Sequence, residues 1–228
     1  MIRKERHVLI VLPHPDDEAF GFSGTAAHHI QNGTPVTYVC LTLGQMGRMM
    51  GNPLFANRET LPLIRERELE ASCRSIGITD LRKFGLRDKT VEFEDPEALA
   101  DRILDVVRET DPSLIMTFHP ELSVHPDHNA TGAAVIRAVA RLPEPERPDI
   151  YCLGFANQVE QVLGPPDIVH DVSAFAKQKI GSLFAHQSQI QFIHNRFEGK
   201  DPAEDPEQLK KISTERFWTY RWEWNSPS

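Results

Sequence analysis

Two short clusters of histidine and aspartate offer the donor atoms of a metal site. Pro13-His14-Pro15-Asp16-Asp17-Glu18 directly follows an apolar run at residues 8–12, and His125-Pro126-Asp127-His128 lies just past another at 113–118. Acids and histidines crowded at the end of a buried strand repel one another and lose hydration energy unless a cation compensates them. Each cluster therefore predicts one half of a metal site.

The number of available ligands matches catalytic zinc. Zinc in hydrolases commonly takes three histidine or carboxylate ligands and leaves a fourth position for water. His14, Asp17 and His128 supply that set, and the spacing of three residues between His14 and Asp17 lets one turn direct both side chains at one point. Zn²⁺ is the predicted ion, with Fe²⁺ as an alternative because it shares these ligand types.

The other polar residues of the clusters have predicted roles in catalysis. Asp16 lies beside the ligands but is not needed by the metal, so it is the candidate base that takes a proton from water and returns it to a leaving group. His125 is the candidate electrophile or acid facing an oxyanion or a leaving amine. Asp127 is expected to accept the second ring N–H of a ligand histidine, and it is also well placed to cap a helix.

The pattern of elements predicts how the two clusters meet. Short apolar runs alternate with segments of helical period, which favours an α/β, Rossmann-like fold with a mostly parallel sheet and helices on both faces. Ligands in such sheets bind beyond the carboxyl ends of the strands, where both clusters lie. The predicted strands are 7–12, 35–42, 81–85, 113–118, 150–156 and 167–172, and the predicted helices are 19–32, one that ends near 75, 96–109, 127–141 and 173–186.

Composition limits the kinds of partner. The chain has 228 residues, 40% of them hydrophobic, and a formal net charge of −8, and we expect a single domain over residues 1–228. No Lys/Arg-rich run is present, so neither nucleic acid nor a membrane is expected as a partner, and a small-molecule substrate is. Three scattered cysteines and no signal-like segment predict a cytoplasmic location.

Two segments near the C-terminus depart from the alternation. Residues 198–207 carry few apolar side chains, which predicts an exposed linker. Residues 217–224 contain five aromatic side chains, which must be buried against the domain itself or in a subunit interface. A homo-oligomer is therefore one of our expectations.

Taken together, the two clusters resemble the LmbE-like, or PIG-L, zinc-dependent N-deacetylases. The resemblance extends over about residues 7–190. It implies a Rossmann-like fold, zinc held by His14, Asp17 and His128, Asp16 as the base and His125 as the group that stabilises an oxyanion. These implied roles agree with those derived from the residues themselves.

Further stretches are similar to one branch of that family. Residues 42–53, 57–62 and 85–90 resemble the bacillithiol-biosynthesis branch, which removes acetate from N-acetylglucosaminyl malate, and some of whose members also hydrolyse a bacillithiol S-conjugate. The resemblance implies this deacetylation as the function of the chain. A deacetylase of another N-acetyl glycan or small N-acyl amine is the main alternative, ahead of a metal phosphoesterase and a non-catalytic metal- or sugar-binding module.

The candidate substrate-binding residues include one departure from the family pattern. Arg48 is expected to pair with a substrate carboxylate, and Gln45, Arg58 and His186 are further candidates. Gln45 stands where the pattern has an acid, and a neutral amide cannot replace a carboxylate in an ion pair. Ser123 stands where some relatives have tyrosine and is too short to reach an oxyanion, so His125 is expected to act alone.

Overall fold

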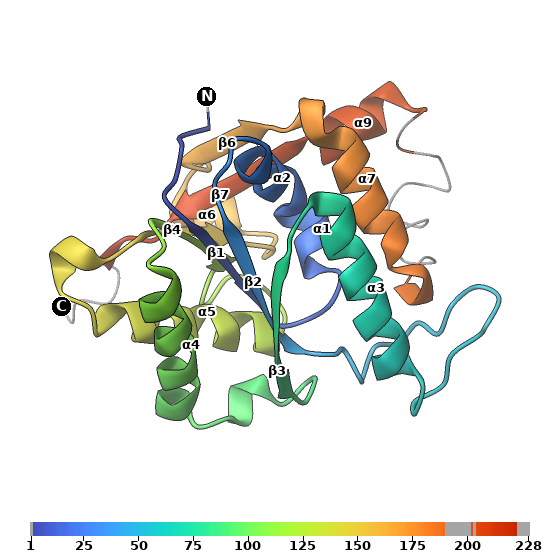
Figure 1. Ribbon diagram of the computed structural model, residues 1–228, viewed down its shortest axis with the longest axis horizontal. Helices are drawn as coiled ribbons and strands as arrows, with labels where there is room; N and C mark the ends of the chain where they lie inside the picture. Colours follow the sequence, from blue (N-terminus) through green and yellow to red (C-terminus); the bar gives the residue numbers. More distant parts are fainter. Residues whose placement is uncertain (1, 190–201, 203, 223–228) are drawn as a thin grey trace.

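The fold is built around a seven-stranded sheet. The computed structural model describes residues 2–189, 202 and 204–222, and within them the strand order is β3-β2-β1-β4-β5-β7-β6 (Figure 1). The predicted α/β class is confirmed. The strands are β1 (Val8–Leu12), β2 (Val36–Thr42), β3 (Asp80–Leu86), β4 (Leu114–Phe118), β5 (Asp149–Leu153), β6 (Ile168–Asp171) and β7 (Thr214–Thr219).

The centre of the sheet is parallel and its far edge is not. β1 lies between β2 and β4, with Val8 opposite both Val36 and Leu114, and β3 and β5 extend this parallel part. β7 is antiparallel to both β5 and β6. The sequence predicted the burial of the aromatic tail but not that it forms a strand. Since β1, β2 and β4 are buried along their whole length, they lack the polar alternation of a strand with one exposed face.

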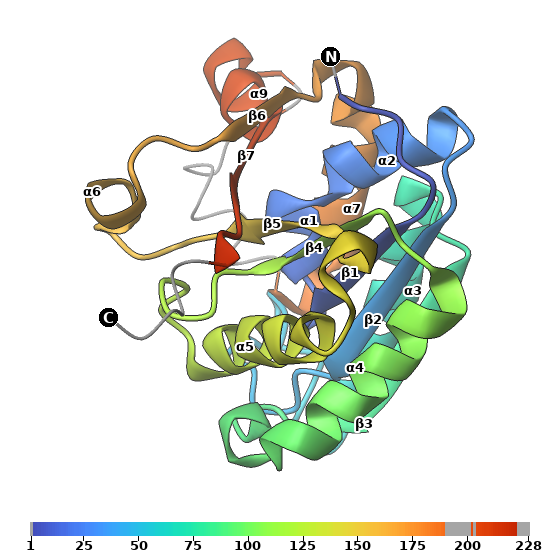
Figure 2. The same cartoon turned by 90° about the vertical axis from the view of Figure 1, so that its left-hand side faces the viewer.

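Helices cover both faces of the sheet (Figure 1, Figure 2). One layer consists of α1 (Asp17–Gly21), α2 (Ser23–Gln31), α3 (Leu61–Ile76) and α7 (Ala176–Ala185), and the other of α4 (Pro96–Thr110) and α5 (Pro126–Ala140). Each layer encloses its own hydrophobic core against the sheet. The other helices among the described residues are α6 (Val159–Leu163), α9 (Pro206–Ile212) and 3₁₀ turns at Val91–Phe93, Glu144–Glu146, Ser173–Phe175 and Gln187–Gln189.

The helix predicted at 19–32 is two helices. Phe22 has a non-helical backbone, with φ −131°, and separates α1 from α2. Its side chain is fully buried in the core between the sheet and this helical layer. Gly21 makes the close approach possible, because a Cβ there would lie 2.2 Å from Cδ2 of Leu153 on β5. Tertiary packing against the strands therefore breaks a segment whose local sequence is helical.

Half of the predicted linker at 198–207 lies outside the described residues, namely 198–201 and 203. Its end does not fit the prediction, because Pro206 begins α9 and the Asp205 side chain caps that helix by accepting hydrogen bonds from two backbone N–H groups. A proline at the first helical position after an aspartate cap is a strong helix start, which the low apolar content of the segment obscured.

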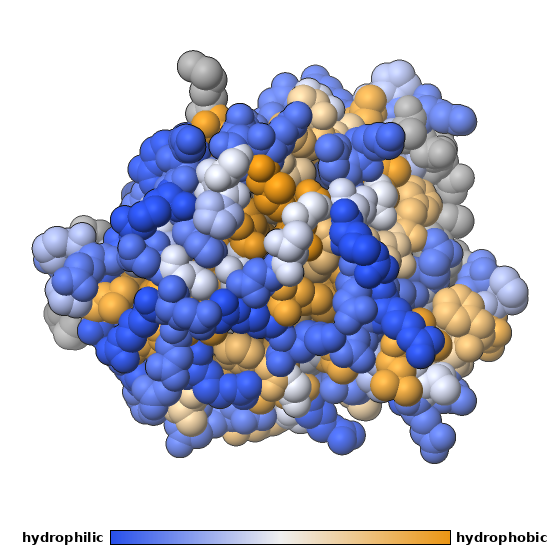
Figure 3. Space-filling model, in the orientation of Figure 1, coloured by the Kyte–Doolittle hydropathy of each residue, from blue (hydrophilic) through white to orange (hydrophobic). Residues whose placement is uncertain are grey.

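On the face shown in Figure 3, hydrophilic side chains dominate and hydrophobic ones form scattered groups. The loop between β2 and α3 extends away from the sheet (Figure 1) and exposes Leu54 and Phe55. Within the described part of the chain, each helix is too short or too polar to cross a bilayer.

Candidate functional site

The first cluster lies where β1 ends. Pro13 and Pro15 stop the strand because each lacks the backbone N–H that a sheet requires, and α1 begins two residues later at Asp17. Asp16, between them, has a left-handed backbone with φ 91°, which is costly for a residue with a Cβ. This sharp turn places His14, Asp16 and Asp17 together at the carboxyl edge of the sheet.

Donor atoms of three residues from the two clusters converge, with Asp17 presenting one carboxylate oxygen to each histidine. His14 Nδ1 lies 3.3 Å from His128 Nε2 and 3.4 Å from Asp17 Oδ2, and His128 Nε2 lies 3.2 Å from Asp17 Oδ1. Tetrahedral coordination with bonds of about 2.0–2.1 Å places ligand atoms about 3.3–3.4 Å apart. The arrangement therefore fits one first-row metal ion.

Charge supports the same reading of these three residues. All three are largely buried. Although burial opposes it, the neighbouring His128 and His14 hold the pKa of the Asp17 carboxyl well below its usual range. Asp17 is therefore a carboxylate at neutral pH, the form that binds a cation.

Two carboxylates contact the other ring nitrogen of His14. His14 Nε2 lies 3.0 Å from Asp127 Oδ2 and 3.2 Å from Asp88 Oδ1. A carboxylate in this position fixes the tautomer of a ligand histidine so that the opposite nitrogen can bind metal. Asp127 Oδ2 lies within hydrogen-bond distance of this ring nitrogen. The cap of α5, for which Asp127 was also considered, is provided by His125, whose Nδ1 accepts the Asp127 N–H. Asp88, to which the sequence analysis assigned no role, shares the contact with His14 Nε2.

The Asp16 side chain is held beside His14 and Asp17 by Arg65, a residue to which the sequence assigned no role. Its Oδ2 accepts a hydrogen bond of 2.9 Å from Arg65 Nη2, and Arg65 is itself buried, donating also to the carbonyl oxygens of Pro15 and Gly44. Burial raises the pKa of Asp16 to about 6, although the Arg65 cation opposes the rise. An acid with a pKa near neutrality suits a group that both accepts and returns a proton.

Glu18 stabilises the turn at Asp16 through hydrogen bonds. Its fully buried carboxylate accepts the backbone N–H of Asp16 at 3.1 Å and hydrogen bonds from Ser72 at 2.5 Å and Tyr38 at 3.2 Å, and it contacts His186 Nε2 at 2.7 Å. These partners take up both carboxylate oxygens of Glu18, since Asp16 and Tyr38 contact Oε2 and Ser72 and His186 contact Oε1. Glu18 therefore fixes the turn and does not contribute a ligand atom.

A cavity of about 710 Å³ opens over these groups. His14, Asp16, Asp17, His125 and His128 all line it. Its other lining side chains come from the loops that follow β2, β3, β4 and β5, from α1, α3 and α5, and from the 3₁₀ turn Gln187–Gln189. They are Phe20, Met46, Arg48, Arg65, Asp88, Lys89, Ser123, Val124, Pro126, Phe155 and Gln189.

The four candidate substrate-binding residues separate in the structure. Arg48 lines the cavity, whereas Gln45, Arg58 and His186 are not among its lining residues. Gln45 uses both ends of its amide on the β3 side, with Nε2 donating to Leu86 O and Oε1 accepting from Asp88 N. Arg58 is exposed and donates to Gly47 O at 2.7 Å. His186 is fully buried against Glu18, so its predicted contact with substrate is not supported.

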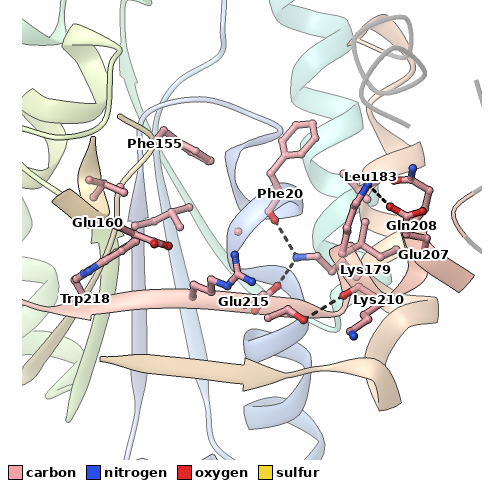
Figure 4. Close-up of a pocket in the computed structure, with 18 residues that line it drawn as sticks. Phe20, Phe155, Glu160, Lys179, Leu183, Glu207, Gln208, Lys210, Glu215 and Trp218 are labelled. Carbon is pink, nitrogen blue, oxygen red and sulfur yellow. Dashed lines mark hydrogen bonds and ion pairs between the residues drawn. The ribbon is translucent and has the colours of Figure 1, made fainter. Parts of the chain in front are cut away.

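A second cavity, of about 800 Å³, borders the first. The two share Phe20 and Phe155 in their linings. In this second cavity the buried Lys179 ammonium from α7 donates to Phe20 O on α1 at 3.0 Å and pairs with Glu215 on β7 (Figure 4). This pair ties the helical layer to the sheet and lies apart from the metal ligands.

The fold and site thus define an α/β protein with a buried cluster of histidines and carboxylates, spaced so that it could hold a metal ion, at the carboxyl edge of its parallel strands. Residues 9–139 match the family described as PIG-L: GlcNAc-PI de-N-acetylase. The match covers more than half of the chain, and the chain belongs to this family of metal-dependent deacetylases. The resemblance to LmbE-like proteins is confirmed.

Individual relatives span nearly the whole chain. The chain is 50% identical over 219 residues to a probable N-acetyl-alpha-D-glucosaminyl L-malate deacetylase 2 of Bacillus cereus, covering 96% of this chain and 100% of the relative. It is 47% identical to the protein of the same description from Bacillus subtilis, covering 96% and 99%. The N,N'-diacetylchitobiose deacetylase structure from Pyrococcus horikoshii aligns over 95% of this chain and 84% of that one, with a TM-score of 0.73 and 23% identity, which supports the fold.

Proposed function

We propose that this chain is a zinc-dependent deacetylase that releases acetate from N-acetylglucosaminyl L-malate in bacillithiol biosynthesis. The observation that carries the chemistry is the tetrahedral spacing of His14 Nδ1, Asp17 and His128 Nε2, with the Asp16 carboxyl beside them. The substrate assignment is supported by two relatives described as malate deacetylases that are 47–50% identical over nearly the full chain. Zinc is favoured by the donor set, which iron would share.

The metal and Asp16 divide the work of hydrolysis. A zinc ion held by the three ligands would polarise the acetyl carbonyl and make a water molecule more acidic. Asp16 takes the proton of the attacking water at Oδ1, because Oδ2 is occupied by Arg65. It then returns this proton to the departing amine.

His125 is the second catalytic residue of the proposal. The backbone N–H of Asp127 donates to His125 Nδ1 at 3.1 Å, so Nδ1 carries no proton and Nε2 is the N–H donor of the neutral ring. Burial, followed by the nearby His14 and His128, lowers the pKa of His125, which favours this neutral form. We assign the Nε2–H to the developing oxyanion of the acetyl group.

The remaining parts of the proposal concern the molecule as a whole. We propose that residues 1–228 form one catalytic domain, supported by a single sheet that includes both early and late strands. Cys40, Cys73 and Cys152 are free and buried, which agrees with a reducing, cytoplasmic setting. A homo-oligomer remains part of the proposal and is tested by the molecular mass of the protein in solution.

The test compares two substrates in metal-loaded and chelator-stripped protein. N-acetylglucosaminyl L-malate and N-acetylglucosamine are incubated with each, and released acetate and new primary amine are measured. Metal-dependent hydrolysis that strongly favours the malate conjugate supports the proposal. Equal, weak hydrolysis of both substrates would assign the chain to another N-acetyl substrate, and no hydrolysis by metal-loaded protein would contradict deacetylation.

The role of Asp16 is tested in the same assay. Asp16→Asn is expected to keep bound metal but lower kcat by about 10²–10⁴-fold, because the base is lost while the three ligands remain. Asp105→Asn, an exposed aspartate on α4, is the matched control. Turnover that survives in Asp16→Asn would remove the base assignment, and loss of metal would show that Asp16 acts as a ligand.

A further inference from the structure

The cavity of about 710 Å³ over His14, Asp17 and His128 is lined by two cationic side chains that have no acidic partner among the described residues. The carboxylates that line it all have partners, since Asp16 pairs with an arginine and Asp17 and Asp88 each contact a histidine. Arg48 and Lys89 also line the cavity. Neither side chain forms an ion pair or hydrogen bond with any residue that the structure describes. Two positive charges therefore face a cavity that does not neutralise them.

The two cations lie on one wall because their loops are fastened together. Arg48 belongs to the loop after β2 and Lys89 to the loop after β3. Gln45 bridges these loops, with Nε2 donating to Leu86 O at 3.3 Å and Oε1 accepting from Asp88 N at 3.0 Å. The backbone N–H of Met46 adds a third bond, of 2.8 Å, to Asp88 Oδ2. The amide of Gln45 thus organises this wall.

Lys89 is also tied to the metal site through its backbone. It has a left-handed conformation, with φ 64°, a region that costs a lysine energy and that glycine or asparagine would adopt more easily. Its N–H donates to Asp127 Oδ2 at 2.7 Å, the same carboxylate oxygen that contacts His14. The backbone from which the exposed Lys89 side chain projects is therefore held by the carboxylate that contacts His14.

The other side of the cavity is apolar. Val124 and Phe155 line it and come from the loops after β4 and β5, which lie across β1 from β2 and β3. Both are exposed although hydrophobic, with 72% of Val124 and 40% of Phe155 accessible. The cavity is thus cationic on one side of the metal ligands and apolar on the other.

We propose that Arg48 and Lys89 form a two-cation clamp that binds the carboxylates of a dicarboxylic acid joined to the N-acetyl sugar, while Val124 and Phe155 contact the sugar ring. The inference rests on the proposed deacetylase function and deepens it by assigning Lys89 to substrate selection. Lysine and arginine in a partly closed cavity form charge-assisted hydrogen bonds that a neutral aglycone cannot accept. The clamp therefore selects by charge at a distance from the acetyl group.

The experiment measures binding and turnover separately. Lys89→Met and Arg48→Met remove one charge each at similar length, Lys89→Arg keeps the charge, and Arg87→Met is the matched control. Arg87 lies in the same loop, is exposed and does not line the cavity. For kinetics, each substitution is introduced alone into the wild-type sequence and the protein is assayed with metal bound. Each is also combined with Asp16→Asn for titration calorimetry with N-acetylglucosaminyl malate, so that the ligand is not consumed.

The clamp predicts a selective loss of affinity. Lys89→Met and Arg48→Met should each weaken binding of the malate conjugate about tenfold, and kcat/KM should fall by several times more for this conjugate than for neutral methyl N-acetylglucosaminide. Lys89→Arg should recover most of the affinity, and Arg87→Met should match wild type.

The two proposals fail in different ways. Binding of the conjugate that depends on Lys89 but is not followed by turnover in wild type would overturn the function and leave the clamp. Turnover of the conjugate with Lys89→Met and Arg48→Met indistinguishable from Arg87→Met would overturn the clamp and leave the function. Equal losses on the conjugate and the neutral glycoside would also overturn the clamp, and absence of conjugate binding in every protein would overturn both.

Discussion

The contact of two carboxylates with one ring nitrogen of His14 predicts a measurable redundancy in metal binding. Asp127 Oδ2 at 3.0 Å and Asp88 Oδ1 at 3.2 Å both face His14 Nε2, which has one proton to donate. Replacing either acid by asparagine removes a charge while keeping its shape. The remaining carboxylate can still accept the proton, so each single substitution is expected to be milder than the pair.

The expected magnitudes follow from how partners of a ligand histidine act. Loss of such a carboxylate typically lowers metal affinity by about 10–100-fold. We expect about threefold for Asp88→Asn, about tenfold for Asp127→Asn and about 100-fold or more for the double variant, which exceeds the product of the single effects. Asp127 also accepts the backbone N–H groups of Lys89 and Val91, so its substitution should cost about 1–2 kcal/mol of folding stability as well.

Metal affinity is measured by competition with a chromophoric chelator, and stability is measured separately on metal-free protein. Asp105→Asn serves as the control for a lost surface charge. Affinities of all three variants equal to wild type would refute the idea that these carboxylates orient His14. Single effects that multiply to give the double effect would refute the shared proton, because independent partners contribute additively to the free energy.

Two further predictions concern stability. Burial, and then the neighbouring His28, lowers the pKa of His29 to about 4, below the usual histidine pKa of about 6.5. Between these two values the unfolded chain binds the proton more readily than the folded one, so acid destabilises the fold. Wild type should lose about 2 kcal/mol more than His29→Gln between pH 7.5 and pH 5 in urea unfolding, and identical losses would disprove this. Val124 has φ 62°, unfavourable for a β-branched residue, so Val124→Asn should raise the free energy of unfolding by about 1 kcal/mol, and a decrease would count against strain.

Much of the fold follows from the sequence because its signals are local. The apolar runs that became β1, β2 and β4 and the proline-started helices α4 and α5 depend on residues within each segment. β7 could not be predicted in this way. Whether a run of aromatic residues forms a strand or a packed loop depends on the edge available to it, and here β5 and β6 provide both edges.

The same distinction between local and long-range signals applies to the candidate site. The spacing of His14, Asp17 and His128 predicted a convergence that the geometry now supports, because motif spacing and strand position determine it. The supporting residues were missed because they come from elsewhere in the chain, as Arg65 does from α3. Gln45 was predicted to contact substrate, whereas its amide forms hydrogen bonds with the backbone after β3. This pairing joins two separate loops, so the local sequence around Gln45 does not reveal it.

The position of β7 has a consequence for the order in which the molecule assembles. β6 hydrogen-bonds only to β7 in the described sheet, although β7 is encoded well after it and is separated from it by α7 and α9. Glu215 on β7 also accepts the backbone N–H groups of Gly24 and Thr25 on α2. A nascent chain that has emerged only as far as α7 thus exposes the edge of β5 to which β7 later pairs. It also lacks the Glu215 carboxylate that accepts hydrogen bonds from α2. Chaperone binding or aggregation would be expected to act at that stage of synthesis.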